Sequence, residues 1–398
     1  MAATRRTTTK QAGTKAVPLP GKLASKNAAE QYEQPPFTLK DVRDAVPAHC
    51  FKRDTLRSMG YVAHDLVLAA ALFYAATFIP QLPLAAQAVA WPAYWVAQGI
   101  VCTGIWVLAH ECGHGAFSPS KAVNDTVGYI LHTALLVPYF SWKYTHSKHH
   151  KATNHMTKDQ VFVPSRRAEV NPTIKRAIPA SENLADGDEH PLTEVAPIFA
   201  VFELARMLIF GWPAYLIYNA SSQQYTQFAS HFLPSSPMFD PKHAQGVFAS
   251  DIGVVAMIAL LAYCGQVFGS WNVVTFYVLP YLMVNFWLVT ITFLQHTDPE
   301  LPHYSNEHWD FLKGALATMD RDYGILNYFH HHIGDTHVVH HLFSTMPHYH
   351  AEEATEAVKK VLGKFYHHDD RAISAALYQS MVKCRFVEDS GDVLFFKY

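Results

Sequence analysis

Two long stretches of the chain carry no Asp, Glu, Lys or Arg. They are residues 66–110 and 252–297, of 45 and 46 residues. A helix that crosses the hydrocarbon core of a membrane needs about 20 residues, so each stretch is long enough for two crossings. Turn-forming residues lie near the middle of each stretch: Pro80 and Pro83 in the first, and Gly269, Ser270 and Asn272 in the second.

This pattern predicts an all-α integral membrane protein with four transmembrane helices in two hairpins. The helices are expected near residues 64–80, 86–109, 251–269 and 273–295. Paired helices in a soluble core normally turn one polar face to water, and these stretches have none. Residues 35–398 are expected to form one domain, in which a helical cytosolic cap holds a dimetal site. Residues 1–34 are rich in Thr, Lys, Ala and Gln, and a disordered cytosolic tail is expected there.

Two weaker apolar segments, 127–142 and 196–220, lie between the hairpins. The second contains Glu203 and Arg206, and a charge at the centre of a membrane span costs a few kcal/mol. Both segments are therefore expected to lie on the bilayer as interfacial or re-entrant helices, with a spanning 196–220 as the alternative. A polar linker is expected over residues 165–195.

The distribution of basic residues predicts the orientation in the membrane. The first 60 residues contain eleven Lys or Arg, whereas the turns within the two hairpins contain none. Cytosolic segments carry the excess of Lys and Arg. Both termini and the segment 110–250 are therefore expected on the cytosolic side.

Composition changes this picture only through histidine. Half of the 398 residues are apolar, which excludes a disordered protein, and a net charge of −2 gives no basic field for a nucleic acid. The mean hydropathy of +0.01 is the average of the uncharged hairpins and the charged remainder of the chain. Twenty-five residues are His, and 18 of them lie in the windows 110–155 and 296–350.

Three histidine clusters in these windows have the spacing of metal ligands. Residues 110–114 read HxxxH, and residues 146–150 and 337–341 both read HxxHH. Side chains three and four residues apart share one face of a helix, so each cluster directs two or three imidazoles the same way. Zinc usually takes four ligands, so eight imidazoles suggest two metal ions. Imidazole suits zinc, copper, iron and nickel, and the spacing alone does not choose between them.

The three clusters, in this order and separated by paired spans, resemble the histidine boxes of the membrane-bound fatty-acid desaturase family. The resemblance covers residues 37–398 and is strongest to the fungal and plant acyl-lipid delta-12 (oleate) desaturases. Five further segments resemble the corresponding segments of these desaturases: Pro47–Phe51, Leu136–Trp142, Leu294–Thr297, Phe343–Glu353 and Cys384–Asp389.

The resemblance implies a diiron centre with nine histidine ligands and with dioxygen as co-substrate. Eight ligands come from the boxes, and His296 at the end of the fourth span takes the place of the ninth. The nine are His110, His114, His146, His149, His150, His296, His337, His340 and His341. Gln295 and Asn285 are candidates for a polar residue that holds a water on one iron. Four more histidines are expected around the site or at the surface: His132, His155, His303 and His348.

The resemblance also implies the reaction, which is the introduction of a delta-12 double bond into phospholipid-bound oleoyl chains to give linoleoyl chains. The alternatives within the family are an omega-3 (delta-15) desaturase and a fatty acid hydroxylase. A kinked apolar tunnel must position the acyl chain, and the spans together with residues 196–220 are expected to supply its walls.

Neither a haem-binding nor a dinucleotide-binding motif is found, so separate cytochrome b5 and NADH-cytochrome b5 reductase are the expected electron donors. Three lysines, Lys143, Lys148 and Lys151, are candidates for steering an acidic donor. The terminal residues 394–398 resemble an aromatic retrieval signal, which predicts an endoplasmic reticulum membrane protein.

Three alternative interpretations use residues of the same clusters or of the same spans. Residues 110–114 also read HExxH, the motif of zinc proteases, with Glu111 as general base, but both HxxHH boxes would then have no role. Glu111-x-x-His114 and Glu300-x-x-His303 match the pattern of soluble ferritin-like diiron proteins. A metal transporter or sensor is the third, although transporters carry ionisable residues within their spans.

Overall fold

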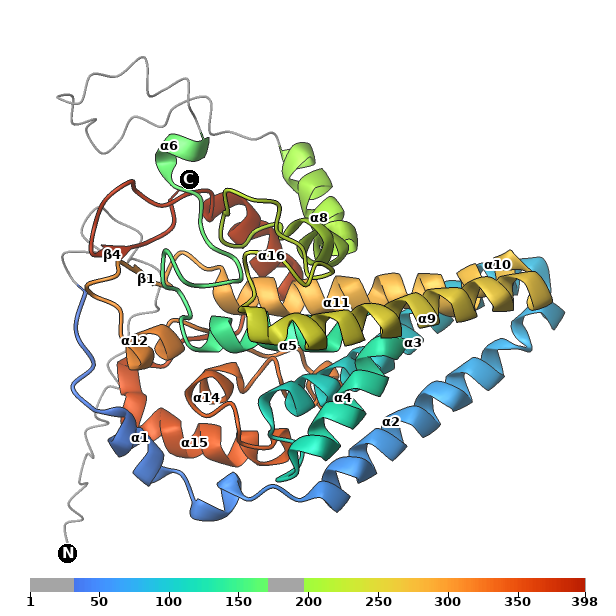
Figure 1. The fold of residues 1–398 in the computed structure, drawn as a ribbon, viewed down its shortest axis with the longest axis horizontal. Coiled ribbons are helices and arrows are strands. Elements are labelled where there is room, and N and C mark those ends of the chain that lie inside the picture. Colours follow the sequence, from blue (N-terminus) through green and yellow to red (C-terminus); the bar gives the residue numbers. More distant parts are fainter. Residues whose placement is uncertain (1–31, 171–196, 398) are drawn as a thin grey trace, which may run out of the picture.

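The computed structural model describes residues 32–170 and 197–397, and within these ranges the fold is almost entirely helical. Four long helices extend lengthwise through the molecule (Figure 1). They are α2 (Thr55–Ala76), α3 (Leu84–His114), α9 (Ala244–Phe268) and α11 (Leu279–His296), and α3 packs against both α2 and α11. The short α10 (Ser270–Val273) and a π-helical turn (Val274–Val278) continue directly into α11. These elements form the two predicted hairpins with shifted limits: α2 begins nine residues before the predicted start and ends at Ala76, whereas α3 extends beyond its predicted limits at both ends.

Both hairpins turn at the same end of the molecule. A 3-10 turn (Ile79–Gln81) and Pro83 separate α2 from α3. Gly269 separates α9 from α10 with a φ of 92°, a left-handed conformation that glycine adopts without steric cost. The prolines and the glycine that marked the turns in the sequence therefore lie at the turns.

Within residues 32–170 and 197–397, a further helix, α8 (Pro197–Tyr218), raises the number of segments long and apolar enough to cross a membrane to five. The five are residues 55–81, 84–114, 200–218, 241–268 and 270–296. In Figure 1, α8 lies across one end of α11 at a steep angle, whereas the other four extend lengthwise. Both the interfacial position of α8 and the count of four spans stay predictions.

The other elements gather at the opposite end of the long helices from the two turns (Figure 1). The helices of this cap are α1 (Leu39–Ala45), α4 (Lys121–Ala134), α5 (Tyr139–His150), α6 (Arg167–Val170), α12 (Phe311–Leu316), α13 (Leu326–Phe329), α14 (His337–Leu342), α15 (Ala351–Leu362) and α16 (Ile373–Lys383). Four 3-10 turns accompany them: Ala48–Phe51, Pro241–His243, His348–His350 and Gly363–Phe365.

Four strands of two residues each are the exceptions to the all-α prediction. Strand β1 (His303–Tyr304) pairs antiparallel with β4 (Val393–Leu394), and β2 (Asp320–Arg321) pairs parallel with β3 (His368–Asp369). Both pairs tie the C-terminal region to the segment that follows α11. Most of the expected N-terminal tail and of the polar linker lies outside the described residues.

The packing of α3 against α11 positions the ends of both helices. A side chain at Gly99 of α3 would place its Cβ 2.3 Å from the Cβ of Met283 in α11, so only glycine permits this approach. The same core contains Trp106, Cys112 and Leu294, all buried. His110 and His114 at the end of α3 are thereby brought to the same level as His296 at the end of α11.

Candidate metal centre

Four helices present the nine predicted ligands to one another. The last turns of α3 carry His110 and His114, and the last residue of α11 is His296. Helix α5 carries the second box at its C-terminal end, and α14 consists almost entirely of the third box. The structure therefore brings together all nine histidines, which come from four separate segments of the sequence. Their role as metal ligands is a proposal that the geometry supports.

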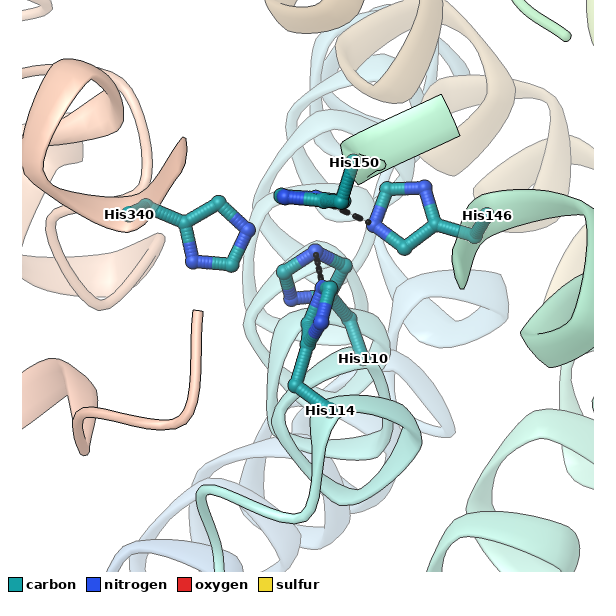
Figure 2. Close-up of side chains that lie close together, drawn as sticks. All are labelled: His110, His114, His146, His150 and His340. Carbon is teal, nitrogen blue, oxygen red and sulfur yellow. Dashed lines mark hydrogen bonds between the residues drawn. The ribbon is translucent and has the colours of Figure 1, made fainter. Parts of the chain in front are cut away.

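Five of the histidines form a first group. His110, His114, His146, His150 and His340 each offer a ring nitrogen, and these nitrogens all lie within 4.8 Å of one another. Figure 2 shows the five rings turned toward a common space from α3, α5 and α14. A set of five neutral nitrogen donors converging from three directions is a suitable cage for a transition-metal ion.

The remaining four histidines form a second group beside the first. Nitrogens of His149, His296 and His341 lie within 4.8 Å of one another. The Nε2 atom of His337 is 3.0 Å from Nε2 of His296. The nine histidines thus divide into five and four, which is the division expected for two metal ions.

The spacing of the nitrogens fits bound metal ions. Nε2 of His110 lies 3.1 Å from Nε2 of His114, and His146 and His150 are paired at the same distance. Two nitrogens that bind one metal at about 2.1 Å each lie about 3.0–3.4 Å apart. In addition, the buried Nε2 atoms of His340 and His341 have no hydrogen-bond partner among the described residues. Buried nitrogens without partners are costly unless a ligand occupies the space between them.

Polar groups behind the rings fix which nitrogen faces the centre. Nδ1 of His149 lies 2.6 Å from the buried carboxylate of Asp159, and Nδ1 of His341 lies 3.1 Å from the hydroxyl of Thr153. In both rings Nε2 is then left for a metal, and such a hydrogen bond also raises the basicity of the imidazole. The spacing of the boxes gave no signal for Asp159 or Thr153, since neither belongs to a box.

Helix α14 is held in place at its first turn. The carboxylate of Asp320 accepts the backbone N–H of Val338 at 2.8 Å and the hydroxyl of Tyr366 at 2.6 Å. All six residues of α14 are buried, so the helix has little freedom to shift. Asp320 thereby orients the three histidines of α14, and sequence reasoning missed it as well.

Burial keeps the cap histidines in the form that binds metals. It lowers the pKa of His146, His150, His337 and His341 well below the ordinary value of 6.5, and the repulsion of neighbouring imidazoles adds to this. The pKa of His340 is lowered to about 3, again mainly by burial. These rings are uncharged at neutral pH, as a metal ligand must be.

An apolar cavity of about 110 Å³ opens directly beside the histidines. His110, His146, His149, His296 and His337 are among the residues that line it. Its walls come from α3, α5, α8, α11 and short connecting segments, and include Trp106, Trp142, Met207, Phe162, Gly211, Trp212, Leu288, Val289 and Ile291. Residues 196–220, which are expected to supply part of a tunnel wall, contribute Met207, Gly211, Trp212 and Tyr215 of α8 to this cavity. That the cavity receives the acyl chain stays a prediction.

The two candidate polar residues of α11 have different positions. Gln295 lines the cavity and donates from Nε2 to the carbonyl of Ile333 at 2.6 Å, while its buried Oε1 has no hydrogen-bond partner among the described residues. Asn285 is fully buried but does not line the cavity. Of the two, Gln295 is placed to hold a water near the histidines.

Of the four additional histidines, His132, His155 and His303 are buried, and the side chain of His348 is 8% exposed, so none of them lies on the surface. His132 packs beside Trp106 and Trp142, next to the first group. His348 lies beside Glu111, which also accepts the backbone N–H of His348 at 3.0 Å. His303 lies in β1, and His155 forms a β-bridge with Tyr304.

The geometry contradicts two of the rival interpretations. Glu111 does not face the cavity, and its carboxylate contacts His348 and, at 3.4 Å, Nδ1 of His110, so it is not placed as the general base of a protease. Glu300 and His303 lie in a turn and a strand, and therefore do not form the helical Glu-x-x-His motif of a ferritin-like protein.

Comparison with known proteins agrees with this site. The model of the fatty acid desaturase family matches residues 89–371, which include all nine histidines. The chain belongs to the fatty acid desaturase family. A second model, of a domain of unknown function, matches residues 5–75 of the desaturase. Membership of an enzyme family also excludes the transporter interpretation.

Curated relatives resemble this desaturase over most of its length. It is 54% identical to a "Delta(12) fatty acid desaturase" of Mortierella isabellina, over 92% of each chain. It is 44% identical to the "Delta(12)-fatty-acid desaturase" of Arabidopsis thaliana, over 89% of each chain. An "Acyl-lipid (9+3)-(E)-desaturase" of Dimorphotheca sinuata is 43% identical, over 94% of this chain and 95% of its own.

Proposed function

We propose that this desaturase introduces a delta-12 double bond into oleoyl chains of membrane lipids and so produces linoleoyl chains. The observation that carries the proposal is the nine-histidine site beside an apolar cavity, in a chain 54% identical to a Delta(12) desaturase. An acyl tail offers no polar group for recognition, so the shape and depth of the cavity must select the bond that reacts.

The nine histidines are proposed to hold two iron ions, five at the first ion and four at the second. When bound, this centre would supply the activation of dioxygen that removal of hydrogen from an unactivated methylene requires. The side chains around it position the acyl chain and exclude water. Trp106, Trp142 and Trp212 form apolar walls beside the histidines, which protects a reactive oxidant from solvent.

Expression in a yeast that makes only monounsaturated fatty acids tests the proposed reaction. Gas chromatography with mass spectrometry is expected to show new linoleate with a cis double bond. Linolenate that appears only after linoleate feeding would identify the omega-3 alternative, and hydroxylated oleate would identify the hydroxylase. A trans double bond at position 12 would instead match the name of the Dimorphotheca (9+3)-(E)-desaturase.

Metal analysis of the purified protein tests the assignment of iron. Two irons per chain are expected, with a marked loss in His110→Ala and His341→Ala. His308→Ala is a matched control, because this side chain is 43% exposed and belongs to neither histidine group. Full iron content in the His110→Ala variant would contradict the ligand assignment.

The electron donors are proposed to be cytochrome b5 and its NADH-dependent reductase. Reduction of dioxygen to two waters takes four electrons, and desaturation supplies two, so a separate donor must supply the rest. Of the three candidate lysines, Lys148 donates to the carbonyl of Met238 at 2.7 Å and Lys143 contacts Asp125, which leaves the exposed Lys151. Reconstitution with cytochrome b5 or with ferredoxin distinguishes the two kinds of donor.

The protein is proposed to lie in the endoplasmic reticulum membrane with both termini in the cytosol. In support, the described parts of the cap lie at one end of the long helices and the uncharged turns at the other. The resemblance of residues 394–398 to a retrieval signal is weak support, since Leu394 and Phe396 are buried and β4 is paired with β1. Protease protection of terminal epitope tags in microsomes tests the orientation.

A further inference from the structure

A second cluster of metal-binding side chains lies outside the nine-histidine site. His49 and Cys50 belong to the 3-10 turn before α2, while His350 and Glu353 lie at the start of α15, about 300 residues later. One ligand atom from each of the four side chains lies within 4.8 Å of the other three. The cluster therefore joins two distant segments of the cap through one sulfur, two imidazoles and one carboxylate.

The distances within the cluster resemble those around a tetrahedral ion. Nε2 of His49 lies 3.7 Å from Sγ of Cys50 and 2.8 Å from Oε2 of Glu353. A sulfur and a nitrogen that bind the same zinc ion at about 2.3 and 2.1 Å lie about 3.6 Å apart. The rings of His49 and His350 are 5.4 Å apart between centroids, close enough for both to face one ion.

Rigid turns present these side chains independently of any ion. Pro47 and Pro347 each precede a 3-10 turn, and the proline ring fixes the backbone at the point where the turn begins. The hydroxyl of Tyr349 accepts the backbone N–H of Asp54 at 2.8 Å, and the guanidinium of Arg57 lies 4.1 Å above the Tyr349 ring. The two turns are therefore held side by side, so that little ordering is needed when an ion binds.

Burial differs across the cluster in a way that suits metal entry. Cys50 is fully buried, whereas the side chains of His49 and Glu353 are each 51% exposed. The sulfur forms the floor of the cluster, and the other ligands are reached from solvent. An ion can therefore enter from the cytosolic cap surface without opening the core.

We propose that His49, Cys50, His350 and Glu353 bind one structural zinc ion. A set of one thiolate, two imidazoles and one carboxylate suits zinc, whereas magnesium and calcium prefer oxygen ligands alone. Four protein ligands also complete the coordination that structural zinc sites have. The proposal does not depend on the reaction proposed above, because none of these residues lines the cavity or belongs to the nine.

The zinc ion would stabilise the packing behind the third histidine box. Cys50 belongs to the same buried core as Val338 and Val339 of α14 and Ala354 of α15. An ion that fastens the turn of Cys50 to the start of α15 restrains two sides of this core. The expected consequence is a stiffer support for α14, not a change in the chemistry of the iron site.

Elemental analysis and zinc X-ray absorption on the full-length, iron-loaded protein test the proposal. We expect one zinc per chain in addition to iron, with one sulfur neighbour at about 2.3 Å and nitrogen or oxygen neighbours at about 2.0–2.1 Å. Cys50→Ser and His350→Ala are expected to lose zinc at least tenfold more readily to a chelator. Their iron content is expected to equal that of the wild type.

Two controls make the outcome decisive. His332→Ala alters the nearby group of His332, Asp335 and Glu352, which contains no sulfur, and it is expected to retain zinc. Should Cys50→Ser fail to fold, His350→Asn keeps the thiol and gives the same comparison at a partly exposed position. Wild-type protein without zinc after zinc incubation and desalting would overturn the proposal. So would zinc with no sulfur neighbour, or zinc retained in both Cys50→Ser and His350→Ala.

Discussion

The imidazole ring of His150 stacks on that of His341, with centroids 4.1 Å apart and planes inclined by 14°. His150 belongs to the group of five histidines and His341 to the group of four. The second and third histidine boxes are therefore in direct contact, and the two candidate metal positions are neighbours. A shift of either α5 or α14 would disturb both positions at once, so the supports of these helices matter for metal binding.

Asp159→Asn is expected to weaken metal binding while leaving the ligands in place. The carboxylate of Asp159 holds Nδ1 of His149 at 2.6 Å, and loss of such a support typically lowers metal affinity 10–100-fold. Iron retained after timed exposure to a chelator measures the effect. Asp310→Asn is the control, because Asp310 is an exposed residue that caps α12. Equal iron retention in the two variants would show that Asp159 does not support the site.

Gly211→Leu is expected to abolish desaturation without loss of iron. Gly211 lies on the wall of the cavity, and an added Cβ would sit 3.5 Å from Met207 and 3.7 Å from Val289. A methyl group thus fits in ordinary contact, whereas the larger leucine must project into the cavity.

Gly211→Ala and Phe210→Leu are the matched controls for this variant. The first adds only the tolerated methyl group, and the second alters a side chain on the same helix that is 59% exposed. Both are expected to retain most of the activity. Activity of Gly211→Leu equal to that of Phe210→Leu would show that the acyl chain does not use this cavity.

Asp298→Ala is expected to destabilise the protein strongly. Asp298 is buried and contacts Arg321 at 2.8 Å and Arg371 at 3.0 Å, and the Arg321 side chain is fully buried. Loss of the partner from a buried ion pair costs about 3–5 kcal/mol. Because Arg321 and Arg371 both still contact Asp369, the lower end of this range is expected. The thermal unfolding temperature in detergent measures the loss. Asp310→Ala, which removes an exposed helix cap worth about 1 kcal/mol, should lower it much less.

The sequence was sufficient for the long apolar helices and for the histidines that come together in one place, because both depend on local patterns. Uncharged stretches define the hairpins, and the spacing of His146, His149 and His150 directs their rings to one side of α5. The pattern of charged and apolar residues is less informative for α8, because Glu203 and Arg206 pair with each other on an exposed face of this helix. Whether α8 crosses the membrane depends on its surroundings and not on its composition.

The supports of the site could not be predicted, because they depend on tertiary contacts. Asp159 lies 10 residues beyond His149, and Asp320 approaches Val338 only after the chain has folded back on itself. Neither contact has a fixed spacing that a motif would show. The pairing of His49 with Glu353, 304 residues apart, is a further example.

A final prediction concerns the attachment of the C-terminal segment at low pH. Arg167 contacts both carboxylate oxygens of Glu388, at 2.7 and 3.0 Å, and Lys397 contacts one of them at 3.1 Å. The Arg167 hydrogen bonds are the main cause that lowers the pKa of Glu388 to about 2 from its ordinary 4.5. The folded state therefore releases this proton more readily than the unfolded state does. Its stabilising contribution is complete above pH 4.5 and is lost as the pH falls toward 2.

The expected effect is less than about 1 kcal/mol, because the pair is partly exposed to solvent. Hydrogen exchange at the amide of Arg167, which donates to the carbonyl of Val387 at 2.9 Å, reports on this attachment. After correction for intrinsic rates, protection of this amide should decline between pH 4.5 and 2 in the wild type. In Glu388→Gln it should already be reduced at pH 7 and change little on acidification, since the titrating group is gone. The same decline in both proteins would assign the pH dependence to another group.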